Sequence, residues 1–189
     1  MDAKTPLKGN QIMLEEAKTE LQRILIGDGV GAPPSHILEA VDDAMAYARL
    51  PGLPHSIYEE VWHLAFWMEL SLDWIAGRLT PYPEHASEGF PQTQIQNLAG
   101  PGGSPSEPWP ALKDRFLRGL DIAAAIAGDP MRLDAPVACP SRPPAEPRVM
   151  PVRDQVDGIA SHNAYHLGRI VAMRQIVGDW PPPSGGDTW

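Results

Sequence analysis

The chain has 189 residues and a mass of 20.6 kDa, which fits one domain spanning residues 1–189. It carries 15 lysines and arginines against 24 aspartates and glutamates, so the formal net charge is −9. This acidic balance argues against nucleic acid or an anionic membrane as a partner, because both require clustered cations. The single cysteine, Cys139, excludes an internal disulfide framework and a cysteine-rich zinc site. A bound transition metal would therefore need histidine ligands, with or without carboxylates.

The N-terminal residues are not followed by an apolar run, so a secretory signal is not expected. The most apolar stretch, residues 57–75, contains Glu59, Glu60 and His63, which makes it a poor membrane span. We therefore expect a cytoplasmic protein that does not enter the membrane.

The first predicted helix covers about residues 7–26. Leu14, Leu21 and Leu25 recur at intervals typical of one helical face, and Gly27 ends the pattern. A shorter helix at about residues 36–48 is expected to connect it to the next long one.

The second long helix is predicted over about residues 56–78, where Ser56 and Glu59 form a capping-box pattern. Apolar side chains surround most of this helix, so it should be buried on several sides. The spare face suggests a homodimer. These side chains are Trp62, Phe66, Trp67, Met68, Leu70, Trp74 and Ile75.

Two further helices are predicted, over about residues 109–127 and 152–177, each with one continuous apolar stripe. Alternating Val/Ile/Thr-rich strands are missing, which argues against a sheet. The predicted fold is therefore all-α, an up-down four-helix bundle with long Pro-rich loops. The loops at 79–108 and 129–151 are long for a bundle, and such loops are usually functional or disordered.

The strongest chemical pattern is the pair His162 and His166. Four helical residues advance by about 400°, so both imidazoles point the same way, one turn apart, and can share one ion. The alternative interpretation is one core and one surface histidine without a common ligand. Asn163 occupies the position of the catalytic glutamate in the metalloprotease pattern His-Glu-x-x-His, so that chemistry is disfavoured.

His63, in the middle of the second helix, is the natural third ligand. Taken alone it would be an ordinary core histidine. Together with His162 and His166 it would complete a three-histidine site with one open position, which is the arrangement of catalytic zinc sites. Glu59 and Glu60 could hold His63 as hydrogen-bond acceptors, although at least one of them should simply complement the helix N-terminus.

These features resemble the DinB/YfiT-like family of metalloenzymes. The resemblance rests on one histidine in helix two, on His162-x-x-x-His166 followed by Leu167-Gly168-Arg169-Ile170, and on the segments 54–78 and 157–189. It implies a DinB-like bundle in which His63, His162 and His166 bind a divalent metal, often zinc or nickel, and it implies frequent homodimers. Characterised relatives use low-molecular-weight thiols such as bacillithiol or mycothiol in transferase and isomerase reactions.

The leading functional hypothesis is a metal-dependent enzyme, a thiol-dependent S-transferase acting on a small-molecule substrate, in which a metal-bound water or thiol reacts. Asn163 is a candidate pocket residue beside Glu59 and Glu60. A metal-dependent hydrolase is the second enzymatic option. Two other classes stay open, namely a metal-stabilised, non-catalytic oligomeric protein and a helical bundle without metal.

The closing segment, from Trp180 to Trp189, contains three consecutive prolines that prevent a helix. Its two tryptophans are a large apolar area to leave in water, so we expect the tail to pack back on the bundle. The alternative is a frayed terminus.

Overall fold

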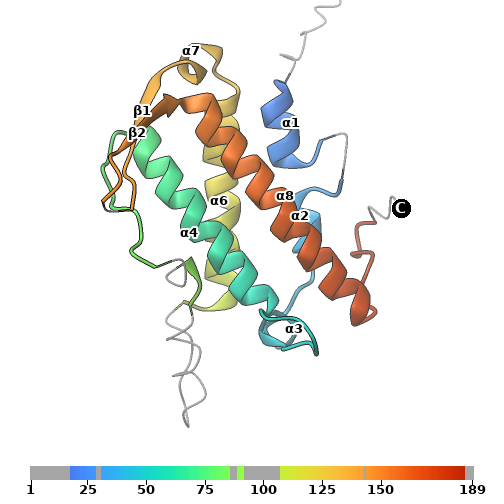
Figure 1. Ribbon diagram of the computed structural model, residues 1–189. Coiled ribbons are helices and arrows are strands. Elements are labelled where there is room, and N and C mark those ends of the chain that lie inside the picture. The colour runs from blue at the N-terminus through green and yellow to red at the C-terminus, as the bar shows by residue number, and fades with distance from the viewer. Residues whose placement is uncertain (1–17, 29–30, 86–88, 92–106, 143, 186–189) are drawn as a thin grey trace, which may run out of the picture.

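The computed structural model describes residues 18–28, 31–85, 89–91, 107–142 and 144–185 (Figure 1). Helices pack together in a bundle, and a small antiparallel hairpin covers one end of it. The elements in chain order are α1 (Glu20–Ile26), α2 (Pro34–Ile37), α3 (Asp43–Tyr47), α4 (Ile57–Ile75), α6 (Trp109–Ala127), α7 (Pro130–Leu133), β1 (Pro136–Cys139), β2 (Arg148–Pro151) and α8 (Val152–Ile176).

The predicted helical bundle is confirmed, and α4, α6 and α8 lie where the apolar periodicity placed them. The part of the first predicted helix before residue 18 lies outside the described residues, and α1 is described from Glu20. The expected helix at 36–48 is instead two short helices, α2 and α3. They are separated by a turn in which Ala40 has a positive φ of 56°, a conformation that interrupts a helix.

The start of α4 confirms the capping box. The hydroxyl of Ser56 accepts the Glu59 backbone N–H, and the Glu59 carboxylate accepts the Ser56 backbone N–H at 2.7 Å. These bonds satisfy two of the free donors at the helix start. Because the entry to α4 is fixed in this way, His63 lies at a defined position two turns further along.

Contacts between α4 and α8 show that these helices are antiparallel. Glu60 of α4 bonds His166 of α8, and His63, one turn later on α4, contacts His162, one turn earlier on α8. The mid-sections of the two helices therefore face each other across the bundle (Figure 1).

The helices α4 and α6 run in the same direction, so the alternating up-down order that we expected does not hold between these two helices. Tyr58, at the start of α4, donates to the carbonyl of Glu107, and Glu69, further along, pairs with Arg115 of α6. The end of α4 and the start of α6 therefore lie at opposite ends of the bundle, which explains why the connection between them is long. Within this connection, the described residues Gly89 and Phe90 lie against His63 of α4.

A two-stranded hairpin is present that the sequence did not lead us to expect. Strands β1 and β2 pair antiparallel, with Val137 opposite Met150 and Cys139 opposite Arg148. Each strand has only four residues, too few to show an alternating pattern, and prolines occupy the pair Pro136↔Pro151 at its end. The 129–151 loop thus contains α7 and this hairpin.

No described helix is long and apolar enough to cross a membrane. Helix α4 has apolar side chains on several faces, as predicted, and most of them are buried in the core. Trp62 and Phe66 are only half-buried and stack on each other with ring centroids 5.3 Å apart.

The tail after α8 is held by a fully buried arginine. The Arg174 guanidinium donates to the Asp179 carboxylate at 2.6 Å and to the carbonyl of Ile37 at 2.8 Å, and it lies over the Trp180 ring. Trp180 packs against the core, as expected for the tail, whereas Trp189 lies outside the described residues. Arg174 therefore joins α8, α2 and the tail.

We predict that Arg174→Met lowers the free energy of unfolding by about 2–4 kcal/mol, because it leaves a buried carbonyl and a carboxylate without their partner. Arg153→Met is the control, because Arg153 also lies on α8 and its exposed pair with Asp134 should contribute less than about 1 kcal/mol. Urea unfolding measures both variants. Equal losses would contradict the role given to Arg174.

Candidate metal centre

The three predicted histidines converge in the structure. One ring nitrogen from each of His63, His162 and His166 lies within 4.8 Å of the others. The Nε2 atoms of His63 and His162 are 3.0 Å apart. Helix α4 supplies the first residue, and the one-turn spacing on α8 places the other two on the facing surface.

Hydrogen bonds to the outer ring nitrogens orient two of the imidazoles. The Nδ1–H of His63 donates to the carbonyl of Gly89 at 2.6 Å, and the Nδ1–H of His166 donates to the Glu60 carboxylate at 2.5 Å. With Nδ1 protonated, the neutral ring keeps its lone pair on Nε2. The acceptors thus direct the Nε2 lone pairs towards the centre of the cluster.

Burial keeps the rings of His63 and His162 neutral. His63 is 8% exposed and His166 is 6% exposed, whereas His162 is half-buried. Desolvation by burial lowers the pKa of His63 to about 4, and the same cause lowers the pKa of His162 to about 4. Neutral imidazoles are the form that binds a metal, so no deprotonation cost arises near neutral pH.

The cluster fits a divalent metal. Zinc binds imidazole nitrogens at about 2.0–2.1 Å in tetrahedral geometry, which places two ligand nitrogens about 3.3 Å apart. The 3.0 Å between the Nε2 atoms of His63 and His162 is close to this value, and all three nitrogens lie within 4.8 Å of one another. Among the described residues the cluster contains three potential ligands and no fourth His, Cys, Asp or Glu, so one coordination position would stay open.

Glu59 and Glu60 of α4 do not have the expected role of hydrogen-bond acceptors for His63. Neither holds His63, whose ring nitrogens face Gly89 and His162. Glu60 is fully buried; one oxygen bonds His166, and the other lies 2.9 Å from the Arg169 guanidinium. Glu59 caps α4 and pairs with Arg49 at 2.5 Å. The helix-terminus interpretation was therefore right for Glu59, and Glu60 orients His166.

The segment 89–91 closes one side of the cluster. The Phe90 ring stacks between His63 and His55, with centroids 4.0 Å and 3.9 Å away. A Cβ on Gly89 would lie 2.5 Å from Nε1 of Trp67, so only glycine fits at this contact. The role of this segment was not predicted from the sequence, because any residue type can supply a backbone carbonyl. A loop also has no helical or strand periodicity from which its position beside His63 could be predicted.

Asn163 and Tyr165 lie away from the centre of the cluster. Asn163 is 4% exposed and lines a separate cavity that none of the three histidines lines. Tyr165 is 63% exposed and packs edge-on against His166, with the Arg169 guanidinium over its ring. Asn163, expected as a pocket residue, is buried, but it lines a cavity that contains none of the three histidines.

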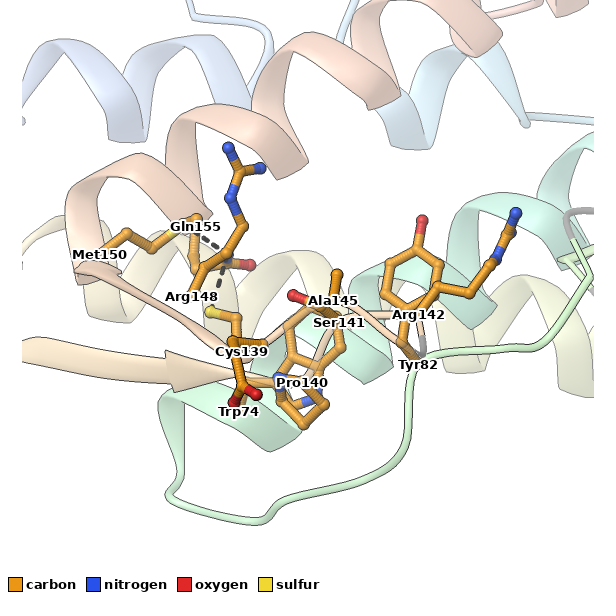
Figure 2. Close-up of a pocket in the computed structure, with 11 residues that line it drawn as sticks. Trp74, Tyr82, Cys139, Pro140, Ser141, Arg142, Ala145, Arg148, Met150 and Gln155 are labelled. Carbon is orange, nitrogen blue, oxygen red and sulfur yellow. Dashed lines mark hydrogen bonds between the residues drawn. The ribbon is translucent and has the colours of Figure 1, made fainter.

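The one cysteine lies elsewhere, in the wall of a pocket of about 610 Å³ at the hairpin end (Figure 2). Figure 2 shows the Gln155 amide directed at the Cys139 sulfur, 3.2 Å away, and at the Met150 sulfur. Burial raises the pKa of the Cys139 thiol above its ordinary value. Cys139 is not among the residues of the histidine cluster.

The fold and the site thus define the class of protein: it is a helical bundle with a buried three-histidine cluster. The family model of the DinB superfamily matches residues 35–170, which include all three histidines. The chain belongs to the DinB superfamily. No curated protein is similar enough to register as a match.

Proposed function

We propose that the protein is a metal-dependent enzyme in which His63, His162 and His166 hold one divalent ion, zinc or nickel. The observation that carries this proposal is the convergence of three imidazoles without a fourth ligand among the described residues. Three protein ligands leave a position for a substrate, whereas structural sites are usually closed by four. His162 is the least buried of the three histidines.

Within this class, we favour transfer of a low-molecular-weight thiol to an electrophilic small molecule. A bound divalent metal supplies a Lewis acid that lowers the pKa of a coordinated thiol or water. In the transfer, the substrate thiol loses its proton to solvent, its sulfur bonds the electrophilic carbon, and the leaving group departs with the bonding electrons. The protein's own thiol is buried away from the cluster, so the reacting thiol would come from outside.

The chain's own residues would then hold and shield the site. Gly89 and Glu60 orient His63 and His166 through their Nδ1–H groups. Phe90 and Trp67 cover one side with apolar rings, which excludes water and strengthens electrostatic interactions there. The arrangement keeps the ligand set fixed, so little reorganisation accompanies substrate binding.

The direct test is turnover by protein loaded separately with zinc and with nickel. Conjugation of bacillithiol, mycothiol or cysteine to an aryl chloride is expected with at least one metal–thiol combination and not with His162→Ala. Ester hydrolysis without any thiol would favour the metal-dependent hydrolase instead. Silence of the fully loaded protein in both assays would contradict an enzymatic role and favour a non-catalytic metal site.

The low pKa values predict how the metal-free protein responds to acid. Between pH 6.5 and 4 the unfolded chain binds protons at these histidines while the folded chain does not. Acid therefore favours unfolding, and stability is expected to fall below pH 6.5 by up to about 1.4 kcal/mol per pH unit for each histidine. Above pH 6.5 their contribution should be constant.

Urea unfolding in the presence of a chelator, from pH 7.5 down to pH 4.5, measures this slope, to which carboxylates also contribute. His162→Gln is the matched variant, because it removes one titrating ring and keeps a polar side chain. It should flatten the slope between pH 6.5 and 4 relative to the unsubstituted chain. Identical slopes would show that His162 titrates normally in the folded state.

We also propose a homodimer, formed through the face of α4 that carries Trp62 and Phe66. These stacked rings remain half-buried, and a second copy would remove them from water. Light scattering at micromolar concentration should give twice the chain mass. A monomeric mass that is unchanged by Trp62→Glu would contradict this proposal.

A further inference from the structure

Arg169 lies behind the candidate metal centre, in contact with the carboxylate that orients one of its ligands. It follows His166 by three residues on α8 and is therefore nearly one turn away, on the same side of the helix. Its Nη2 atom is 2.9 Å from Oε1 of Glu60, and Oε2 of the same carboxylate accepts the Nδ1–H of His166 at 2.5 Å. Glu60 thus connects an arginine to a candidate metal ligand, with one oxygen for each.

The Glu60 carboxylate depends on Arg169 as its charge partner. Glu60 is fully buried, and a carboxylate that is removed from water is costly unless a cation compensates it. Its Oε1 atom makes no hydrogen bond with a described residue, so the ion pair with Arg169 is the polar interaction that remains for this oxygen. Arg49, which also pairs with a buried glutamate of α4, contacts Glu59 instead.

An aromatic ring supports the arginine. The Cζ atom of Arg169 lies 5.9 Å from the centroid of the Tyr165 ring, which is within the range of a cation–π interaction. The same ring packs edge-on against His166, with centroids 4.9 Å apart. The side chain of Arg169 is only 26% exposed, and this partial desolvation strengthens its interactions with Glu60 and Tyr165. Tyr165 therefore contacts both the arginine and the ligand ring.

We propose that Arg169 is a positioning residue of the metal centre, an inference that rests on the proposed metal site. Arg169 anchors one oxygen of Glu60, which keeps the other oxygen on Nδ1 of His166 and directs the Nε2 lone pair of that ring at the ion. Without this anchor, the carboxylate would turn towards the space that the guanidinium leaves, and His166 would lose its acceptor.

The sign of the effect on metal affinity distinguishes positioning from simple electrostatics. A positive charge close to a divalent ion repels it, so loss of the Arg169 charge alone would tighten metal binding. Loss of positioning would weaken it, because the His166 ring would no longer be held in the tautomer and orientation that the ion needs. A purely structural ion pair would change the stability of the fold and leave metal affinity unchanged.

The first test compares zinc affinity in Arg169→Met and Arg49→Met, by competition against a chromophoric chelator. Both changes remove the arginine partner of a buried glutamate on α4, but Glu59 caps the helix and does not bond the histidines. Arg169→Met should weaken zinc binding by about tenfold, the lower end of the range for partners of metal ligands, and Arg49→Met by less than about twofold. Arg169→Lys keeps the charge and should restore part of the loss. Arg169→Gln replaces the methionine variant if that variant does not fold.

The second test is nitrogen-15 NMR of the metal-free chain, which requires neither metal nor turnover. His166 should carry its proton on Nδ1 in the unsubstituted chain and in Arg49→Met. Arg169→Met should show a mixture of the two His166 tautomers, because Nδ1 has lost its fixed acceptor. A change that acts only on the stability of the fold would not alter the tautomer.

Tighter or unchanged zinc binding in Arg169→Met would overturn the proposal, and so would an equal loss in Arg49→Met. An unchanged tautomer of His166 in Arg169→Met would also overturn it. If the unsubstituted chain binds no zinc, the proposed metal site fails. The NMR comparison still tests separately whether Arg169 positions His166.

Discussion

Glu60→Gln is expected to weaken binding of zinc or nickel by about 10–100-fold. The Glu60 carboxylate accepts the Nδ1–H of His166 and lies 2.9 Å from Arg169, so it fixes the tautomer and the orientation of the ring. Glutamine keeps the size of the side chain but is a weaker, uncharged acceptor. Competition against a chromophoric chelator measures the affinity.

Glu59→Gln is the matched control for this experiment, because it makes the same chemical change one residue earlier. Glu59 is equally buried, but it caps α4 and pairs with Arg49, and it makes no hydrogen bond to the three histidines. Glutamine can also complete a capping box, so metal affinity should stay near that of the unsubstituted chain. Similar losses of metal affinity in Glu60→Gln and Glu59→Gln would mean that Glu60 affects metal binding only through the stability of the fold.

His63→Ala removes a metal ligand and is therefore expected to lower metal affinity by more than about 100-fold. A loss of about 100-fold is the most that is expected when only a hydrogen-bond partner of a ligand is removed. It should also destabilise the metal-free protein, since it leaves the Gly89 carbonyl without its donor and one face of Phe90 without its stacked ring. Isothermal titration with zinc and urea unfolding measure the two effects separately.

His55→Ala separates ligation from packing. His55 stacks on the opposite face of Phe90, at nearly the same centroid distance as His63, but it is not part of the cluster. Loss of the His55 ring should lower the free energy of unfolding. Metal affinity should stay within a few-fold of that of the unsubstituted chain. If His55→Ala and His63→Ala lower metal affinity equally, His63 is a packing residue and the proposed ligand set is wrong.

Features that depend on local sequence could be predicted. The capping box at Ser56 and Glu59 acts within one turn, and the apolar stripes of α6 and α8 reflect a helical period that each segment carries itself. The pairing of His162 with His166 is also local, because one turn of helix fixes it. Convergence with His63 followed from the expectation that the two helices face each other.

Features that depend on chain path could not be predicted. The Gly89 carbonyl reaches His63 because the segment 89–91 lies beside α4, and no residue type marks that placement. The bond from Glu60 to His166 needs the antiparallel register of α4 and α8, whereas the sequence places Glu60 nearer to His63. Arg174 is similar: a charged residue in the last turn of a helix is typical of an exposed site, yet tertiary contacts bury it completely.

The most direct test of the metal centre is the metal content of the protein, purified without chelators and without immobilised nickel. Elemental analysis by mass spectrometry would be compared with that of a variant in which His63, His162 and His166 are all alanine. We predict about one divalent ion per chain in the unsubstituted protein and almost none in the variant. A folded protein with no more metal than the triple variant, even after incubation with excess zinc and nickel, would contradict the central claim.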